Sequence, residues 1–432
     1  MANSPDQHLE DAEYPIDCRR VLITDPLPFL DWLRKARGRL IRLEDFELLQ
    51  AWGLTAIAAV SRVEDDDAAD LKFDYNSSAS RFAHSLGLDD VIRGNPPSGY
   101  LEADRTVKLR RFNDFASVEP VSSEISRLII PDEKSKEDGY FDANETRRTI
   151  YYVMVELMRN VVQHSKDKYG GIIVAQLMNK GVEYEYNPCI QIAVSDAGIG
   201  IHDSMKSMHP GIPSAGVALE RAILPRYSGA FPRWKMGTSQ NAGLGLFFIS
   251  EMVKILGGRL LISSRGATLT IQGETEEDSD NKINLYDNDS SGTIVAFEIP
   301  TASVGDHSAM IKVIQKRAES MHANLKPVNF LRYDNAPKYA WEFMVKIAIE
   351  NTSVAEEYSK NNILPKVRSG KPVVFNFQGM NICTQSFLHA LLFDGIQSAH
   401  KNDADIFIKN ASGPVKEGLR FLQNYALNPA GK

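Results

Sequence analysis

The chain has 432 residues, of which 24% are charged and 43% are hydrophobic, and its formal net charge is −7. These values are typical of a globular protein with two or three domains, and they exclude a collagen-like chain, a disordered tail and a lone mini-domain. The mild negative charge offers no broad basic surface for a phosphate backbone, so it disfavours nucleic-acid binding.

The cysteines and the apolar segments indicate a cellular location. Three cysteines, Cys18, Cys189 and Cys383, lie far apart, and their odd number argues against a disulfide framework. The apolar stretch over 53–60 is much shorter than the roughly 20 residues of a membrane helix, and the N-terminus lacks the apolar core of a signal peptide. We therefore expect a cytoplasmic protein that does not cross a membrane.

The first 120 residues are predicted to form an α/β domain. Apolar spacing and capping residues predict helices over 29–33 and 46–60, a strand over 71–75 and a helix over 80–86. A similar order of helix, polar turn, strand and helix recurs from residue 385 onward. Kinship and coincidence explain this weak repeat equally well, so a STAS-like first domain is one alternative for a segment of unknown role.

Residues 146–164 keep apolar residues at helical spacing and carry a polar stripe formed by Glu156, Asn160 and His164. The stripe places a carboxylate and an amide beside the core, where polar groups without partners are costly to bury. A solvent-facing stripe is the alternative when this helix is taken alone.

A strand predicted over 190–196 ends in Asp196, and Gly198 and Gly200 follow. This pattern is typical of a pocket floor, because the carboxylate can accept a hydrogen bond from an exocyclic amine while glycines let a flat ring approach the backbone. A plain turn after an edge strand is the alternative for this motif by itself.

A glycine-rich loop leads into the next predicted helix and contains Gly237, Thr238, Gly243, Leu244, Gly245 and Leu246. The free N–H groups and the partial positive charge at the start of a helix suit an anion such as a phosphate. The loop matches neither the P-loop nor the dinucleotide-binding fingerprint. Taken singly, it is explained equally well as a turn before a core helix.

Together and in this order, the three elements resemble the N, G1 and G2 boxes of the GHKL ATPases, the superfamily of gyrase, histidine kinases and MutL. The resemblance covers about residues 140–300 and includes a late strand that begins at Thr293. It implies an α/β sandwich with a mixed, largely antiparallel sheet that binds ATP and Mg²⁺ under a mobile lid, here residues 201–242. Within the lid, residues 215–224 have helical spacing.

The resemblance also implies roles for single residues. Asn160 would be the ligand of Mg²⁺, Asp196 would accept the adenine amino group, and Thr293 would help to hold adenine. His164 extends the helix pattern to NxxxH, which looks most like the anti-sigma-factor kinase branch. The remaining members of the implied ATP-binding set are Gly198, Gly200, Gly237, Thr238, Gly243, Leu244, Gly245 and Leu246.

Glu156 is the predicted catalytic residue. Hydrolysis needs a base that orients water near the γ-phosphate, and attack by a protein hydroxyl needs the same help. Sensor histidine kinases resemble this helix, but no upstream helix carries a histidine followed by an acidic residue, and His84-Ser85 is a poor substitute. Autophosphorylation on histidine is therefore disfavoured.

The last third of the chain is predicted to contain helices over 311–321 and 341–358 and a strand over 372–377. Residues 365–427 resemble STAS-like domains, although Asn376 stands where such domains often carry an aspartate. Thr384 and Ser386 fit helix-capping hydroxyls better than phosphoacceptors.

These features predict a bacterial regulatory protein with an N-terminal α/β domain (1–120), a GHKL ATPase domain (121–300) and a STAS-like α/β domain (301–432). An ATP-hydrolysing switch read by the flanking domains is the first reading. A serine/threonine kinase that acts on Thr384, Ser386 or a separate STAS protein is the second, and a module that binds ATP only as a structural ligand is the third. A protein partner or effector is expected, and a homodimer stays open.

Overall fold

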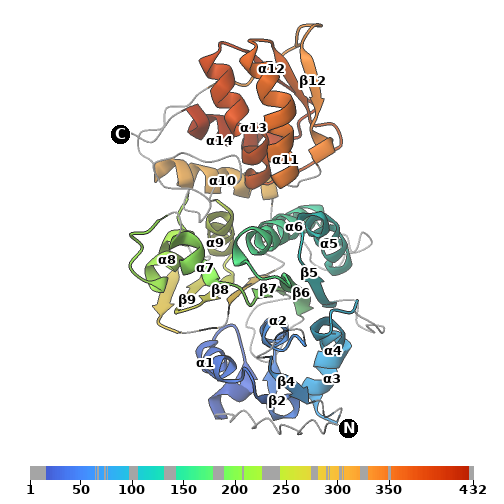
Figure 1. Ribbon diagram of the computed structural model, residues 1–432, viewed down its shortest axis with the longest axis vertical. Helices are drawn as coiled ribbons and strands as arrows, with labels where there is room; N and C mark the ends of the chain where they lie inside the picture. Colours follow the sequence, from blue (N-terminus) through green and yellow to red (C-terminus); the bar gives the residue numbers. More distant parts are fainter. Residues whose placement is uncertain are drawn as a thin grey trace, which may run out of the picture.

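The computed structural model describes residues 16–63, 65, 68–72, 74, 76–96, 106–130, 143–178, 189–206, 209–225, 244–273, 281–288, 290, 292–300, 304, 306–321, 329–348 and 352–427. The fold is mixed α/β, as predicted, and it contains a large antiparallel sheet. Figure 1 shows an N-terminal unit (16–96), a central unit (106–300) and a C-terminal unit (304–427) in succession along the long axis. Among the described residues, no helix combines the length and apolar character needed to span a membrane.

The central unit is built on a seven-stranded sheet with the order β10-β9-β8-β11-β7-β6-β5, in which all neighbouring strands pair antiparallel. The strands are β5 (Thr106–Phe112), β6 (Gly171–Met178), β7 (Cys189–Asp196), β8 (Arg259–Ser264), β9 (Ala267–Gln272), β10 (Lys282–Tyr286) and β11 (Thr293–Pro300). Its helices are α5 (Phe115–Ile129), α6 (Ala143–Asn160), the π-helical turn η3 (Val161–Ser165), α7 (Gly200–Lys206), α8 (Ala215–Ala222) and α9 (Gly245–Ile255).

Both faces of this sheet are covered, which explains why every residue of β7 is buried. Because side chains alternate along a strand, Ile173 and Ala175 join the core cluster on the side of α5, α6 and α9. Ile172 and Val174 join a second cluster formed mainly by the N-terminal unit. The sheet is therefore a layer shared by two cores (Figure 1).

The N-terminal unit packs its fully buried helix α2 (Ala51–Val60) against β6 and β7. The helix predicted over 46–60 begins only at residue 51, because β3 (Leu48–Leu49) pairs in parallel with β1 (Arg20–Val21). Strand β5 lies within the first 120 residues but joins the central sheet. The remaining elements are η1 (Ile16–Arg19), α1 (Leu27–Lys35), β2 (Leu40–Arg42), η2 (Leu43–Asp45), β4 (Asp70–Lys72), α3 (Ser78–Ser85) and α4 (Leu88–Ile92).

The C-terminal unit contains a three-stranded parallel sheet with the order β12-β13-β14. The prediction of one helix over 341–358 is wrong in its first part, because β12 (Trp341–Met344) pairs with β13 (Val373–Asn376). Helix α10 (His307–Ser320) contacts α6 and α9 on one side and α14 (Gly413–Leu427) on the other. The other elements are η5 (Val345–Ala348), α11 (Thr352–Tyr358), η6 (Ser359–Ile363), α12 (Leu364–Arg368), α13 (Gln385–Lys401) and β14 (Ile406–Lys409).

The packing of α2 against the sheet can be tested with a core truncation. Ile57 is fully buried, so Ile57→Ala is expected to lower the free energy of unfolding by about 2–5 kcal/mol through lost burial and a residual cavity. Val63→Ala is the control, because Val63 is 56% exposed and its truncation should change stability by less than about 0.5 kcal/mol. Urea titration measures both values, and equal effects would contradict this packing.

Candidate functional site

A cavity lies between the end of α6, the adjoining ends of β7 and β11, helix α7 and the start of α9. Its lining brings together eight residues of the predicted nucleotide set: Asn160, His164, Asp196, Gly200, Leu244, Gly245, Leu246 and Thr293. Three others, Gly237, Thr238 and Gly243, lie outside the described residues, as do positions 207, 208 and 226–242 of the predicted lid. The part of the lid predicted to be helical contains α8.

The end of α6 is where the helix changes its winding. Directly after Asn160 the chain forms the π-helical turn η3, a feature that is frequent at functional sites. The turn keeps Asn160 and His164 on the cavity. Burial lowers the pKa of His164 to about 4, so this side chain is neutral at physiological pH and brings no positive charge to the cavity.

Asp196 ends β7 inside the cavity, where only 3% of its surface is exposed. Its Oδ1 accepts a hydrogen bond from the backbone N–H of Gly198 (2.8 Å). Burial raises the pKa of Asp196 to about 7; the hydrogen bond from Gly198 opposes this shift and the nearby Asp167 carboxylate adds to it. The result is an acceptor that suits an amino group in a water-poor setting.

The loop after Asp196 needs glycine for steric reasons. A Cβ on Gly198 would collide with the backbone carbonyl of Ser165, and Gly292, at a φ of +73°, lies equally close to the carbonyl of Asp196. Gly200 begins α7 at a φ of +80°, in the left-handed region. Gly198 is therefore part of the wall that fixes Asp196, although it is not among the residues that line the cavity.

The start of α9 lies at the cavity, where Leu244, Gly245 and Leu246 form part of its wall. Within the described residues no side chain caps this helix, and its first N–H groups have no partner inside the helix itself. Such a helix start suits an anion. Together with the Asp196 acceptor, it gives the cavity both a buried hydrogen-bond acceptor and a helix start that suits an anion.

Glu156 lies next to the cavity and not in its wall. The carboxylate is 2% exposed, and its Oε2 accepts a hydrogen bond from the hydroxyl of Ser386 (2.9 Å). Burial raises the pKa of Glu156, while the Arg159 guanidinium, 4.0 Å from Oε1, and the Ser386 hydroxyl act in the opposite direction. A Cβ on Gly245 would lie 2.6 Å from Oε2, so the start of α9 is equally close.

Ser386 is the site residue whose position the sequence did not predict. It belongs to the first turn of α13, in the C-terminal unit, yet it lines the same cavity as Asn160 and Asp196. The pattern around it favoured a helix cap, with a phosphoacceptor as the alternative. The cap is confirmed for Thr384, whose hydroxyl oxygen accepts a hydrogen bond from the N–H of Phe387 (3.2 Å).

The side chains at the cavity limit how a metal ion could be bound there. Among the described residues, no group of three or more His, Cys, Asp and Glu is placed to bind an ion. Mg²⁺ bound to phosphates keeps several waters and needs only one or two protein ligands. Asn160 could supply such a ligand through its side-chain oxygen, because its amide lines the cavity.

A buried ion pair ties the N-terminal unit to the loop after Asp196. The guanidinium of Arg62, with none of its surface exposed, binds both carboxylate oxygens of Asp167 (2.6 and 3.1 Å). Asp167 in turn accepts a hydrogen bond from the backbone N–H of Ala197 (2.8 Å). Asp167 therefore holds the residue next to Asp196, and Arg62 of the N-terminal unit holds Asp167 in place.

Comparison with protein-family models finds no match to this chain, and comparison with curated proteins finds none either. The interpretation of the cavity therefore depends on its own geometry and on the motifs in the sequence.

The buried ion pair between Arg62 and Asp167 is expected to contribute strongly to the stability of the fold. Arg62→Ala leaves the Asp167 carboxylate buried without its main partner, which should cost about 3–5 kcal/mol of unfolding free energy. Arg332→Ala is the matched control, because Arg332 is half exposed in its pairs with Asp334 and Asp405 and should matter far less. Denaturant unfolding compares the two, and similar losses would reject the assigned role of Arg62.

Proposed function

We propose that this chain is a Mg²⁺-dependent, ATP-hydrolysing regulatory protein of the GHKL type, with a STAS-like C-terminal unit. The observation that carries the proposal is the convergence of an adenine acceptor, Asp196, an uncapped helix start at Gly245 and an amide, Asn160, on one cavity. The three come from three sequence motifs that lie far apart in the chain. Chance motif matches would have no reason to meet in space.

The fold is compatible with this proposal. The large antiparallel sheet carries α6 and α9 on one face, and the cavity opens at the ends of β7 and β11. Thr293 of β11 is the pairing partner of Asp196 in β7, which puts both implied adenine contacts in the same register position. The parallel sheet of the C-terminal unit and the capped helix α13 support the STAS-like assignment.

Within this proposal each residue has a distinct task. Asp196 binds the base, the N–H groups at Gly245 bind phosphate oxygens, and Asn160 holds the metal that neutralises the charge on those phosphates. Glu156 orients the attacking group and takes up its proton, and Arg159 stabilises the carboxylate form of Glu156. The C-terminal unit would respond to the nucleotide because Ser386 lines the site. The N-terminal unit would respond because Arg62 binds Asp167, which in turn holds the backbone beside Asp196.

Phosphoryl transfer to Ser386 is the second candidate function, and the hydrogen bond from Ser386 to Glu156 favours it. In that reaction the Ser386 oxygen bonds to the γ-phosphorus while the bond from this phosphorus to the β,γ-bridging oxygen breaks. The hydroxyl proton passes to Glu156, and the products are phosphoserine and ADP.

Two substitutions separate binding from chemistry. Glu156→Gln should leave Mg-ATP affinity nearly unchanged and reduce turnover by about 10²–10⁴-fold, since the residue acts on the attacking group alone. Asn160→Ala should weaken Mg-ATP binding itself. Calorimetry and phosphate release measure the two effects, and full turnover in the Glu156 variant would reject the catalytic role.

Incubation with γ-labelled ATP distinguishes the candidate functions. Label that appears only as free phosphate supports hydrolysis, whereas stable label on the protein that is lost in Ser386→Ala supports transfer to Ser386. Binding without either product would leave a structural ATP module as the function.

The pKa of Asp196 predicts a pH dependence of nucleotide binding. With a pKa of about 7, the carboxylate is mostly protonated at about pH 6 and mostly charged at about pH 8, so affinity for adenine should rise by about tenfold over that range. Asp196→Asn cannot change charge, so its affinity should follow only the titration of the nucleotide phosphates. Calorimetric titrations across this pH range compare the two proteins, and identical profiles would contradict the prediction.

A further inference from the structure

We propose that the first turn of α13 occupies the position of the attacking water, so that the docked C-terminal unit inhibits hydrolysis at the site. This inference rests on the proposed function and concerns its regulation. Ser386 lines the cavity, and its hydroxyl donates to the Oε2 atom of Glu156 at 2.9 Å. A hydrolytic water would need this same acceptor.

The contact leaves little room for water beside the base. Glu156 and Ser386 are 2% and 4% exposed. On the other side of the carboxylate, the backbone of Gly245 is so close that even a Cβ there would lie 2.6 Å from Oε2. The Oε2 atom is thus enclosed by the start of α9 and the start of α13.

The same turn of α13 also engages the arginine beside the base. Arg159 donates a hydrogen bond to the hydroxyl of Thr384, the N-cap residue of α13. Arg159 and Thr384 are both buried, so the C-terminal unit contacts the carboxylate and its positive neighbour at once. Separation of α13 would therefore change the electrostatic setting of Glu156 as well as its access to water.

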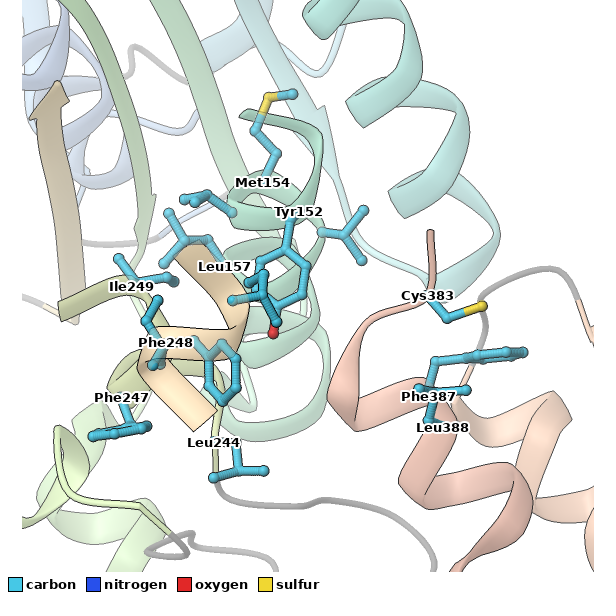
Figure 2. Packing of buried hydrophobic residues seen from close by; sticks show 14 of the residues in the cluster. Tyr152, Met154, Leu157, Leu244, Phe247, Phe248, Ile249, Cys383, Phe387 and Leu388 are labelled. Carbon is cyan, nitrogen blue, oxygen red and sulfur yellow. The ribbon is translucent and has the colours of Figure 1, made fainter. Parts of the chain in front are cut away.

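Apolar side chains also link the C-terminal unit to the central unit. Cys383, Phe387 and Leu388 belong to the same buried cluster as Leu157 of α6 and Phe247 of α9. Figure 2 shows the first three at the start of α13, with Leu157 and Phe247 on the other side of the view. A third hydrogen bond, from the side-chain amide of Gln163 in η3 to Thr352 in α11 (2.7 Å), lies at another point of the same interface.

The inference assigns two states to the chain. In the docked state the nucleophile position holds a serine hydroxyl, and hydrolysis is slow. In the undocked state water reaches Glu156, so ATP turns over. A partner protein that binds the C-terminal unit, or a modification of Ser386, would act by shifting the balance between these states.

Replacement of Ser386 by a bulky residue in the full chain tests the proposal. Ser386→Trp does not fit the enclosed position, so it should displace α13 and raise phosphate release by about tenfold or more. Lys401→Trp is the matched control, because it places the same bulk at the exposed far end of α13. Thiol labelling reports the displacement directly: Cys383 is buried at the interface and should become reactive, while buried Cys18 and Cys189 should not.

The outcomes separate this inference from the proposed function. Unchanged phosphate release in a Ser386→Trp protein whose Cys383 has become reactive would overturn the inhibition. If calorimetry shows that the wild-type protein does not bind ATP, the proposed function is overturned instead.

A second variant covers the case in which Ser386→Trp does not fold. Ser386→Gly removes the hydroxyl without adding bulk and opens space for one water beside Glu156. Faster phosphate release is expected from it, and an unchanged or slower rate would overturn the inhibition.

Discussion

A buried carboxylate needs hydrogen-bond donors from its surroundings, and the start of α13 in the C-terminal unit supplies one to Glu156. Glu156 projects from α6 into an apolar region, where an unpaired charge would be costly. The Ser386 hydroxyl, from a segment 230 positions later, is its hydrogen-bond partner. The hydrogen bonds from Arg159 to Thr384 and from Gln163 to Thr352 join the same two units, so the contact at Glu156 is one of several polar contacts between them.

Buried polar side chains also find hydrogen-bond partners on the side of the central sheet that faces the N-terminal unit. Gln191 of β7 faces the N-terminal unit and is buried, and its amide oxygen accepts a hydrogen bond from the N–H of Trp52 at the start of α2 (3.1 Å). Further along the same strand, the hydroxyl of Ser195 forms a hydrogen bond with the hydroxyl of Thr55 (2.7 Å). The strand that ends in Asp196 therefore carries polar groups that hydrogen-bond to the N-terminal unit, although the Gln191 side-chain amide also donates to Glu298 of β11 (2.6 Å). Flanking units on opposite sides thus contact the neighbourhoods of Glu156 and Asp196 through different residues.

Sequence predicted those elements whose pattern is local and strong. Three elements show this: the helix with Glu156, the strand that ends in Asp196 and the helix that begins near Gly245. Each has a clear repeat of apolar residues, and each occurs where that repeat predicted it. The short strand β12 was missed, because four residues of mixed apolar character fit a helix as well as a strand until pairing with β13 decides. A longer apolar run is needed before periodicity alone distinguishes the two.

The contact between Ser386 and Glu156 could not be predicted for a different reason. A hydroxyl near a helix start has a sufficient local explanation as a cap, and Thr384 indeed performs that role, so nothing in the segment indicated a distant carboxylate. The contact also bears on which chemistry the docked state allows. Burial raises the pKa of Glu156, and a protonated acid cannot take a proton from any nucleophile, whereas Arg159 and the donated hydroxyl favour the carboxylate. Under the proposed function, a protonated Glu156 would leave the docked site idle, whereas a carboxylate stabilised by Arg159 could take the hydroxyl proton of Ser386.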